Sequence, residues 1–248
     1  MTARGQALRD EQHGFSLVEL LAAMAIGSLV LTVLMTIFIT GVQGTSRIQD
    51  RVDSAQRARV ALDSITTLLD SQVCVPRVSG TSTNILSDAP VIAGSDGSSV
   101  TFYGDLSGAG TQPMKYTIAY SPTAKTLTKY TYAATGNTPT RSFLATKTAV
   151  LIVSDVMPTS VNGVVQPIFT YYTYLSGTAA QNGQISPAPS PVPLTPDASP
   201  QVVRVGVQFQ AYSSTGHVDN KQHAVVSGSA TAATFTPDPA APSVCPPS

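Results

Sequence analysis

The sequence predicts an α+β protein in which one long amino-terminal helix precedes an antiparallel β-sheet head with long loops. Residues 15–42 form an unbroken apolar run with a single charge, Glu19, and residues 46–74 place apolar side chains three or four positions apart. Beyond residue 75, short stretches alternate apolar and polar side chains between segments rich in Ser, Thr, Gly and Pro. These patterns are typical of a helix that continues beyond a membrane and of strands joined by turns.

The composition excludes several classes of protein. The 248 residues carry 14 basic and 14 acidic side chains, and charged residues make up 11% of the chain, against roughly 25% in ordinary soluble domains. A balanced charge provides no basic field to hold phosphates, so we expect no direct nucleic-acid partner. Blocks of Val, Ile, Leu, Phe and Tyr can bury surface, which excludes a chain disordered throughout.

The apolar run is long enough to cross a membrane. Its 28 residues would span roughly 42 Å as a helix, at about 1.5 Å per residue, whereas the hydrocarbon core of a bilayer is about 30 Å thick. A secretory signal would have a shorter apolar core followed by a small-residue cleavage site, which residues 41–46 do not supply. On length alone, the run predicts a simple membrane anchor after the polar residues 1–14.

Glu19 is the feature that a simple anchor does not explain. A carboxylate within a membrane span costs about 2.5–3.5 kcal/mol on insertion scales, so such a residue is by default a candidate for function. Cleavage between Gly14 and Phe15 would create a positively charged amino terminus four residues before Glu19, on the same helix face. The new terminus, of the same chain or of a neighbouring subunit, would then serve as the counter-ion of the carboxylate.

These residues resemble the prepilin signature of the type IV pilins and pseudopilins, which is a short polar leader, Gly, Phe, three apolar or small residues and then Glu. Here the signature is Gly14, Phe15, residues 16–18 and Glu19. The resemblance implies that a membrane aspartyl peptidase removes residues 1–14 on the cytoplasmic side and methylates the new amine of Phe15. It also implies a pilin-like fold, in which Glu19 pairs with the terminus of a neighbouring subunit as a fibre grows.

Two further observations bear on this resemblance. Thr36 stands where many type IV pilins have a proline that bends the helix, so no bend is implied there. Four arginines follow the apolar run within residues 47–59 and two precede it, a bias that alone would place the head in the cytoplasm. The cleavage motif and the cysteines favour the opposite topology, with the leader in the cytoplasm and the head outside it.

The resemblance further implies a structural subunit with no enzymatic activity and no cofactor. Its partners would be other pilin or pseudopilin subunits, the prepilin peptidase, an inner-membrane assembly platform and membrane lipid, in a fibre at the cell surface or in the periplasm. The length, about 234 residues without the leader, favours a minor subunit over a major one. Whether it serves a type IV pilus or a type II secretion pseudopilus stays open. The alternative is a singly anchored surface domain, an adhesin or receptor that does not polymerise.

If the chain is a pilin-like subunit, residues 15–45 form the membrane and assembly helix, and residues 46–74 form its amphipathic continuation. The apolar spacing after residue 46 predicts one buried face. The expected stripe consists of Ile48, Val52, Ala55, Ala58, Leu62, Ile65 and Leu69. The other faces carry four arginines and four aspartates, which we interpret as a solvated surface, with charge pairing between subunits as the alternative. Pro76 cannot continue a helix, so the helix should end near residue 72.

Residues 75–248 predict the extracytoplasmic head, built on one antiparallel sheet. The clearest hairpin pairs residues 115–120 with residues 125–132 across the turn 121–124. In a long strand at 202–212, alternate residues from Val203 to Ala211 share a face. Further strands are expected at 100–103, 149–153, 168–174 and 224–226.

Three segments of the head predict loops. Residues 79–99 and 104–112 are rich in Ser, Thr and Gly and should lie at the surface. Residues 186–200 hold six prolines and predict an extended, polyproline-like loop. A role for this loop as a ligand for a partner's groove is the alternative.

The two cysteines favour a disulfide bond if the head is exported. Cys74 follows the helix and Cys245 lies near the carboxyl terminus, and an even number of cysteines in an exported protein invites pairing. The bond would tie the carboxyl-terminal tail to the end of the helix. Two free buried thiols are the alternative.

A search for chemistry finds no catalytic motif. The sequence contains no phosphate loop, GxSxG, HExxH or CxxC pattern. His217, Asp219 and His223 lie close together and could be interpreted as metal ligands, but in a turn between strands we interpret them as solvated side chains. We therefore expect neither an enzyme nor a metal site.

Overall fold

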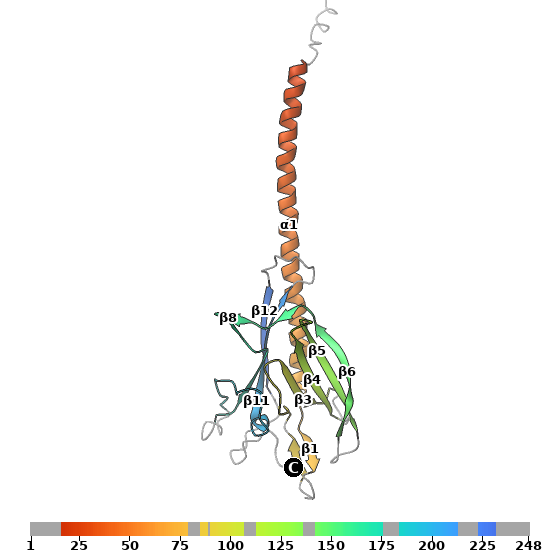
Figure 1. Ribbon diagram of the computed structural model, residues 1–248, viewed down its shortest axis with the longest axis vertical. Coiled ribbons are helices and arrows are strands. Elements are labelled where there is room, and N and C mark those ends of the chain that lie inside the picture. Colours follow the sequence, from red (N-terminus) through yellow and green to blue (C-terminus); the bar gives the residue numbers. More distant parts are fainter. Residues whose placement is uncertain are drawn as a thin grey trace, which may run out of the picture. The chain divides into compact units, whose positions relative to one another are not determined.

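The computed structural model describes residues 16–78, 85–88, 90–106, 113–135, 142–175, 184–212 and 223–231. In these ranges the chain has one long helix, α1 (Leu17–Asp70), followed by antiparallel β-sheets (Figure 1). The chain divides into two compact units, Met1–Gln49 and Asp50–Ser248, so the boundary falls within α1. The predicted α+β fold class, with a pilin-like order of elements, is confirmed.

The second half of α1 buries one face in the head, because small and aliphatic side chains recur there every three or four residues. The buried residues of this face are Ser54, Ala58, Ala61, Ile65, Leu68 and Leu69. The predicted stripe was wrong at its beginning, since Ile48 is 67% exposed and Val52 is 49% exposed. Ser54 is the first fully buried residue of α1, so an apolar period alone could not fix where burial begins.

α1 ends at Asp70, close to the predicted residue 72. The backbone N–H of Ser71 still donates to the carbonyls of Thr67 and Leu68, and that of Val73 donates to the carbonyl of Tyr103 at 3.0 Å. The chain therefore passes directly from the helix to the edge of the head. There β1 (Val75–Val78) pairs with β2 (Ile85–Asp88) in a hairpin.

The first large sheet contains four antiparallel strands in the order β3 (Ser99–Gly104), β4 (Met114–Ser121), β5 (Thr126–Thr135) and β6 (Ser142–Val153). The predicted hairpin at 115–132 is present as β4 and β5. β6 is an edge strand of this sheet and begins well before the predicted residue 149. Its first part is supported by cross-strand packing, since the ammonium group of Lys147 lies 3.8 Å from the centre of the Tyr130 ring.

The second large sheet joins β10 (Phe169–Thr173), β11 (Val202–Tyr212) and β12 (His223–Thr231), and β7 (Val156–Met157) pairs with one end of β11. Alternate residues of β11 from Val203 to Ala211 are buried, as predicted. The expectation of a single sheet was wrong. A turn at Asp155, whose φ is 58°, carries the chain from the edge of the first sheet into the second.

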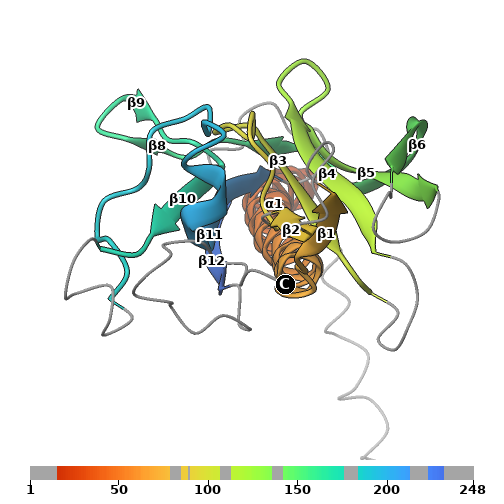
Figure 2. The ribbon, with the colours of Figure 1, turned by 90° about the horizontal axis from the view of Figure 1, so that it is seen from below.

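The two sheets lie on either side of the second half of α1, seen end-on in Figure 2. Together they enclose one core, in which Phe102, Phe169, Phe209 and Tyr171 are fully buried beside Ile65 of the helix. Burial of one large apolar side chain contributes about 1.5–3 kcal/mol, so this core holds the helix and both sheets together. β12 approaches the helix closely at Gly228, where a Cβ atom would lie 3.1 Å from the Leu62 side chain.

Tyr171 connects the two sheets through its hydroxyl group. The hydroxyl lies 3.0 Å from the carbonyl of Asp96 and 2.9 Å from that of Ser99, where the chain enters β3, and its one proton is shared between these two acceptors. Burial raises the pKa of Tyr171, and the charge of Asp96 raises it further, so the phenol remains a protonated donor. Because a buried hydroxyl without a partner would be costly, these bonds fix how this segment sits on β10.

Several predicted loops contain regular structure or buried residues. β2 lies within the segment 79–99, and Val91 of the same segment is 1% exposed, so that segment is not wholly a surface loop. The proline-rich segment also folds against the head, with Leu194 only 2% exposed. Leu194 exchanges backbone hydrogen bonds with Gly94 and Ser95, and a 3-10 helix, η1 (Ser199–Gln201), closes the segment. The continuous polyproline-like conformation that its prolines predict is therefore absent over the described residues 184–201.

Candidate functional site

The first half of α1 is apolar on every face. Its large apolar side chains from Leu17 to Val42 are 44–73% exposed, and mean hydropathy reaches 2.4 over an 18-residue window. In the part of the chain that the structure describes, α1 is the one helix long and apolar enough to cross a membrane. A helix that is apolar all round is suited to lipid or to other apolar helices rather than to water.

The hydroxyl groups in this half are satisfied within the helix itself. Each hydroxyl donates to a backbone carbonyl three or four residues earlier, at distances of 2.8–3.0 Å. The donors are Ser28, Thr32, Thr36, Thr40 and Thr45. Because the hydrocarbon core of a membrane offers no hydrogen-bond partner, this arrangement removes the main cost of placing hydroxyls there.

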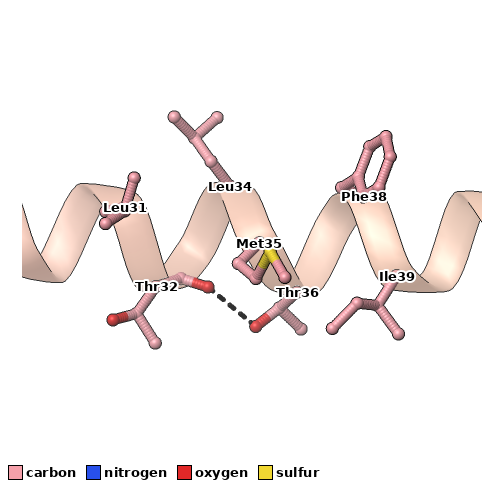
Figure 3. Close-up of a pocket in the computed structure, with 7 residues that line it drawn as sticks. All are labelled: Leu31, Thr32, Leu34, Met35, Thr36, Phe38 and Ile39. Atoms are coloured by element: carbon pink, nitrogen blue, oxygen red, sulfur yellow. Dashed lines mark hydrogen bonds between the residues drawn. The ribbon is translucent and has the colours of Figure 1, made fainter.

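An open apolar recess lies near the middle of this half (Figure 3). Leu34 and Phe38, one turn apart, extend on the same side of the helix, and the Thr36 hydroxyl donates to the carbonyl of Thr32. The seven lining residues are Leu31, Thr32, Leu34, Met35, Thr36, Phe38 and Ile39. None of them carries an ionisable group, so the recess can receive an apolar side chain or an acyl chain and offers no catalytic group.

Glu19 is the ionisable residue of this apolar half. It lies in the first turn of α1, its side chain is exposed, and its backbone N–H donates to the carbonyl of Ser16 at 2.9 Å. An acidic side chain in the first turn interacts favourably with the helix dipole, but that interaction is smaller than the cost of a carboxylate in lipid. Gly14 and Phe15, the predicted cleavage and methylation residues, lie outside the described residues.

The glycines of this half are not required by the packing of the chain itself. A Cβ atom added at Gly27, Gly41 or Gly44 would meet no atom within 4 Å among the described residues. Ala23 and Gly27 lie four residues apart and form the small-residue spacing that allows two helices to approach closely. These positions therefore leave room on the helix surface for a partner.

Residues 9–41 match the family model described as the prokaryotic N-terminal methylation motif. The chain carries the type IV pilin and pseudopilin signature. The match includes Gly14, Phe15 and Glu19, and the resemblance drawn from the sequence is confirmed. A comparison with curated proteins finds no match. The pilin signature points to a structural subunit that associates with other pilin subunits and with a prepilin peptidase, and the apolar helix fits a single-pass anchor.

Arg57 attaches the pilin-type helix to the head, a role that the sequence did not reveal. Its guanidinium donates to the carbonyl of Tyr212 at 2.6 Å and to the carboxylate of Asp53 at 3.0 Å, and lies 3.7 Å from the Asp155 carboxylate. The sequence pattern predicts a solvated face here, and for Arg57 that prediction was wrong. The arginine instead connects α1 to the end of β11 and to the turn between the sheets, contacts that no local pattern could predict.

The remaining candidate residues of the head are only partly described. Cys74 is half-buried between the end of α1 and β1 and is not a free thiol, whereas Cys245 lies outside the described residues. His217 and Asp219 also lie outside them, and His223 begins β12. Within the described ranges, no group of three His, Cys, Asp or Glu side chains is placed to hold a metal ion.

We predict that Arg57→Ala lowers the free energy of unfolding of the head by about 1–2 kcal/mol, because it removes a charge-assisted hydrogen bond at a partly exposed site. Arg59→Ala, at an exposed position of the same helix, should change it by less than about 0.5 kcal/mol. Urea unfolding of the full chain in detergent, followed by near-ultraviolet circular dichroism, measures both. Equal stability of the two variants would show that Arg57 does not hold the helix to the head.

Proposed function

We propose that the chain is a minor subunit of a type IV pilus or type II secretion pseudopilus, stored in the membrane and then assembled into a helical fibre. The observation that carries this proposal is the methylation motif at residues 9–41, which leads directly into an apolar helix. The length of the chain supports a minor rather than a major role. The work of extraction from the membrane would come from a separate ATPase at an inner-membrane assembly platform.

The membrane-stored form would be a single-pass protein with residues 1–14 in the cytoplasm and the head, residues 75–248, outside it. This topology is supported by the motif, whose peptidase acts on the cytoplasmic side. It is also supported by Cys74, which suits an oxidising compartment. The arginines that follow the span oppose this topology by count alone, but Arg57 is engaged by the head and belongs to its fold.

In the fibre, Glu19 would pair with the methylated amine of Phe15 in a neighbouring subunit. The pairing would neutralise a carboxylate that is exposed on an otherwise apolar surface, so it would favour the assembled state over the membrane-stored state. The unfilled space at Gly27, Gly41 and Gly44 supports close packing of apolar helices around that pair.

A singly anchored adhesin or receptor is the other function compatible with a membrane helix and an exported head. Such an anchor needs neither an acid in the first turn of α1 nor a glycine directly before the apolar run. These two features favour the fibre subunit over the simple anchor.

We predict that the chain, produced together with a prepilin peptidase, is recovered with Phe15 as its methylated amino terminus. Gly14→Val should block cleavage, because a branched side chain at the scissile bond hinders the approach of the peptidase. Gly5→Val, in the same leader, should be cleaved normally. Intact mass and terminal sequencing measure all three chains. A wild-type chain that keeps residues 1–14 in the presence of an active peptidase would overturn the proposed function in favour of the simple anchor.

We also propose that Cys74 and Cys245 form a disulfide bond in the exported head. Closing so long a loop stabilises a fold by up to about 5 kcal/mol on the chain-entropy model. Peptide mapping without reduction should yield one peptide that links Cys74 to Cys245, and Cys245→Ser should release Cys74 to alkylation. Two cysteines that alkylate freely in the exported wild-type protein would contradict the bond.

A further inference from the structure

The outer face of the first large sheet carries a row of aromatic and basic side chains. Tyr103 of β3 lies opposite Lys115 of β4. Tyr132 of β5 lies opposite both Lys115 and Lys147 of β6. Because cross-strand partners point to the same side of a sheet, these four side chains share one face. Tyr116, the neighbour of Lys115 along β4, is buried in the core, so the row faces away from the core.

Aromatic rings hold the two ammonium groups of this row. The ammonium group of Lys115 lies 4.4 Å from the centre of the Tyr132 ring and 5.9 Å from that of the Phe143 ring. The ammonium group of Lys147 lies 3.8 Å from the centre of the Tyr130 ring. A ring attracts an ammonium group without neutralising it, so each lysine is positioned while it keeps its charge and its N–H donors.

A stacked pair of rings completes the row. The ring of Phe143 lies on that of Tyr103, with 5.1 Å between their centres and 26° between their planes. The four aromatic residues are half-buried, so part of each side chain stays accessible, and Lys147 is exposed. We call this surface the aromatic–lysine face. It consists of Tyr103, Lys115, Tyr130, Tyr132, Phe143 and Lys147.

The first large sheet has no acidic side chain to neutralise these lysines. Strands β3 to β6 contain three lysines and neither aspartate nor glutamate. Among the described residues, neither Lys115 nor Lys147 forms an ion pair with a carboxylate. The chain as a whole has a formal net charge of zero, so the excess of positive charge is local to this sheet. A local positive field without an acidic partner in the chain favours an anionic ligand.

The geometry of the aromatic–lysine face selects an extended ligand. A sheet face is open, whereas small molecules bind in clefts that enclose them, so a chain molecule matches this face better. The two lysines stand on β4 and β6, two strand spacings or about 10 Å apart, which suits separate charged groups along one chain. The rings and their hydroxyls suit units that present both C–H groups and hydroxyls. Acidic sugar rings combine these properties.

A single-stranded nucleic acid matches the face less well. Its bases stack on free ring faces, and it carries a phosphate at every nucleotide, so tight binding needs several cations along its path. Here ammonium groups already lie over the rings of Tyr130 and Tyr132, and the face supplies two cations. A chain with more widely spaced charges and no need for stacking is therefore the better ligand.

We propose that the aromatic–lysine face binds an acidic polysaccharide, whose sugar rings carry carboxylate groups. The ammonium groups of Lys115 and Lys147 donate charge-assisted hydrogen bonds to those carboxylates. The hydroxyls of Tyr130 and Tyr132 bond to sugar hydroxyls, and the accessible parts of the rings cover sugar C–H groups. This inference goes beyond the proposed function, because a fibre subunit and a singly anchored domain can both display the face.

Binding of polygalacturonate, a chain of uronic acids, to the full-length protein in detergent tests the proposal. Isothermal titration calorimetry should show binding by the wild type. Exchange of both lysines, Lys115→Gln with Lys147→Gln, should weaken binding at least about tenfold. The matched control is Lys125→Gln, at an exposed position in the turn between β4 and β5 and outside the face, which should change the affinity by less than about twofold.

A second variant tests whether the ring positions the ammonium group. Tyr132→Leu keeps both lysines and removes the ring over which Lys115 lies. The affinity for polygalacturonate should fall by about two- to fivefold, although the charge of the face is unchanged. Urea unfolding of the same samples checks that each variant is folded at the temperature of the titration.

Each outcome decides the inference. No binding by the wild type, or the same loss for Lys125→Gln as for the double variant, would overturn it. Equal affinity for polyglutamate would also overturn it, because charge alone would then be recognised. Tighter binding of oligothymidylate than of polygalacturonate would assign the face to nucleic acid instead. The leader takes no part in this assay, so failure of the proposed function appears separately, as an uncleaved leader.

Discussion

One continuous helix that must suit two different surroundings is the constraint on which this protein depends. In its first half α1 is apolar all round, and its Ser and Thr hydroxyls donate to backbone carbonyls of the helix itself, an arrangement that suits surroundings without hydrogen-bond partners. In its second half only one face is apolar, because the head covers that face and water covers the rest. The change from one pattern to the other occurs between residues 46 and 54, without a break in the helix.

In the proposed function, Glu19 favours the assembled state of the apolar half of α1 over its lipid-exposed state. Without Glu19, the apolar half would have a similar free energy in lipid and in a bundle of similar helices, since both surroundings are apolar. A carboxylate raises the free energy of the lipid-exposed state and gains a partner only where the terminus of another subunit lies beside it. On this account the acid both favours assembly and selects one relative position of neighbouring helices.

The sequence predicted the features that depend on neighbouring residues. The span, the end of α1 near Pro76, the hairpin of β4 and β5 and the buried face of β11 all follow from local periodicity or from a single breaker. The division into two sheets did not follow, because the turn at Asp155 and the pairing of β7 with β11 depend on distant residues.

The residues of the candidate site also differ in whether their roles can be predicted from neighbouring residues. Glu19 was visible as a lone charge in an apolar run, whereas the role of Arg57 depends on Tyr212, 155 residues away. The pairing of β8 (Ser160–Val161) with β9 (Val164–Val165) has a local signal, because Asn162 and Gly163 form a two-residue turn between Val161 and Val164.

The measurement that tests the central claim most directly compares membrane insertion with fibre incorporation for Glu19→Val. The account predicts that this variant inserts as well as the wild type or better, while the amount recovered in sheared fibres falls at least about tenfold. Glu11→Val, the same substitution in the leader, should leave both quantities unchanged. Recovery of Glu19→Val in fibres at the wild-type level would contradict the claim that this carboxylate pairs with a subunit terminus.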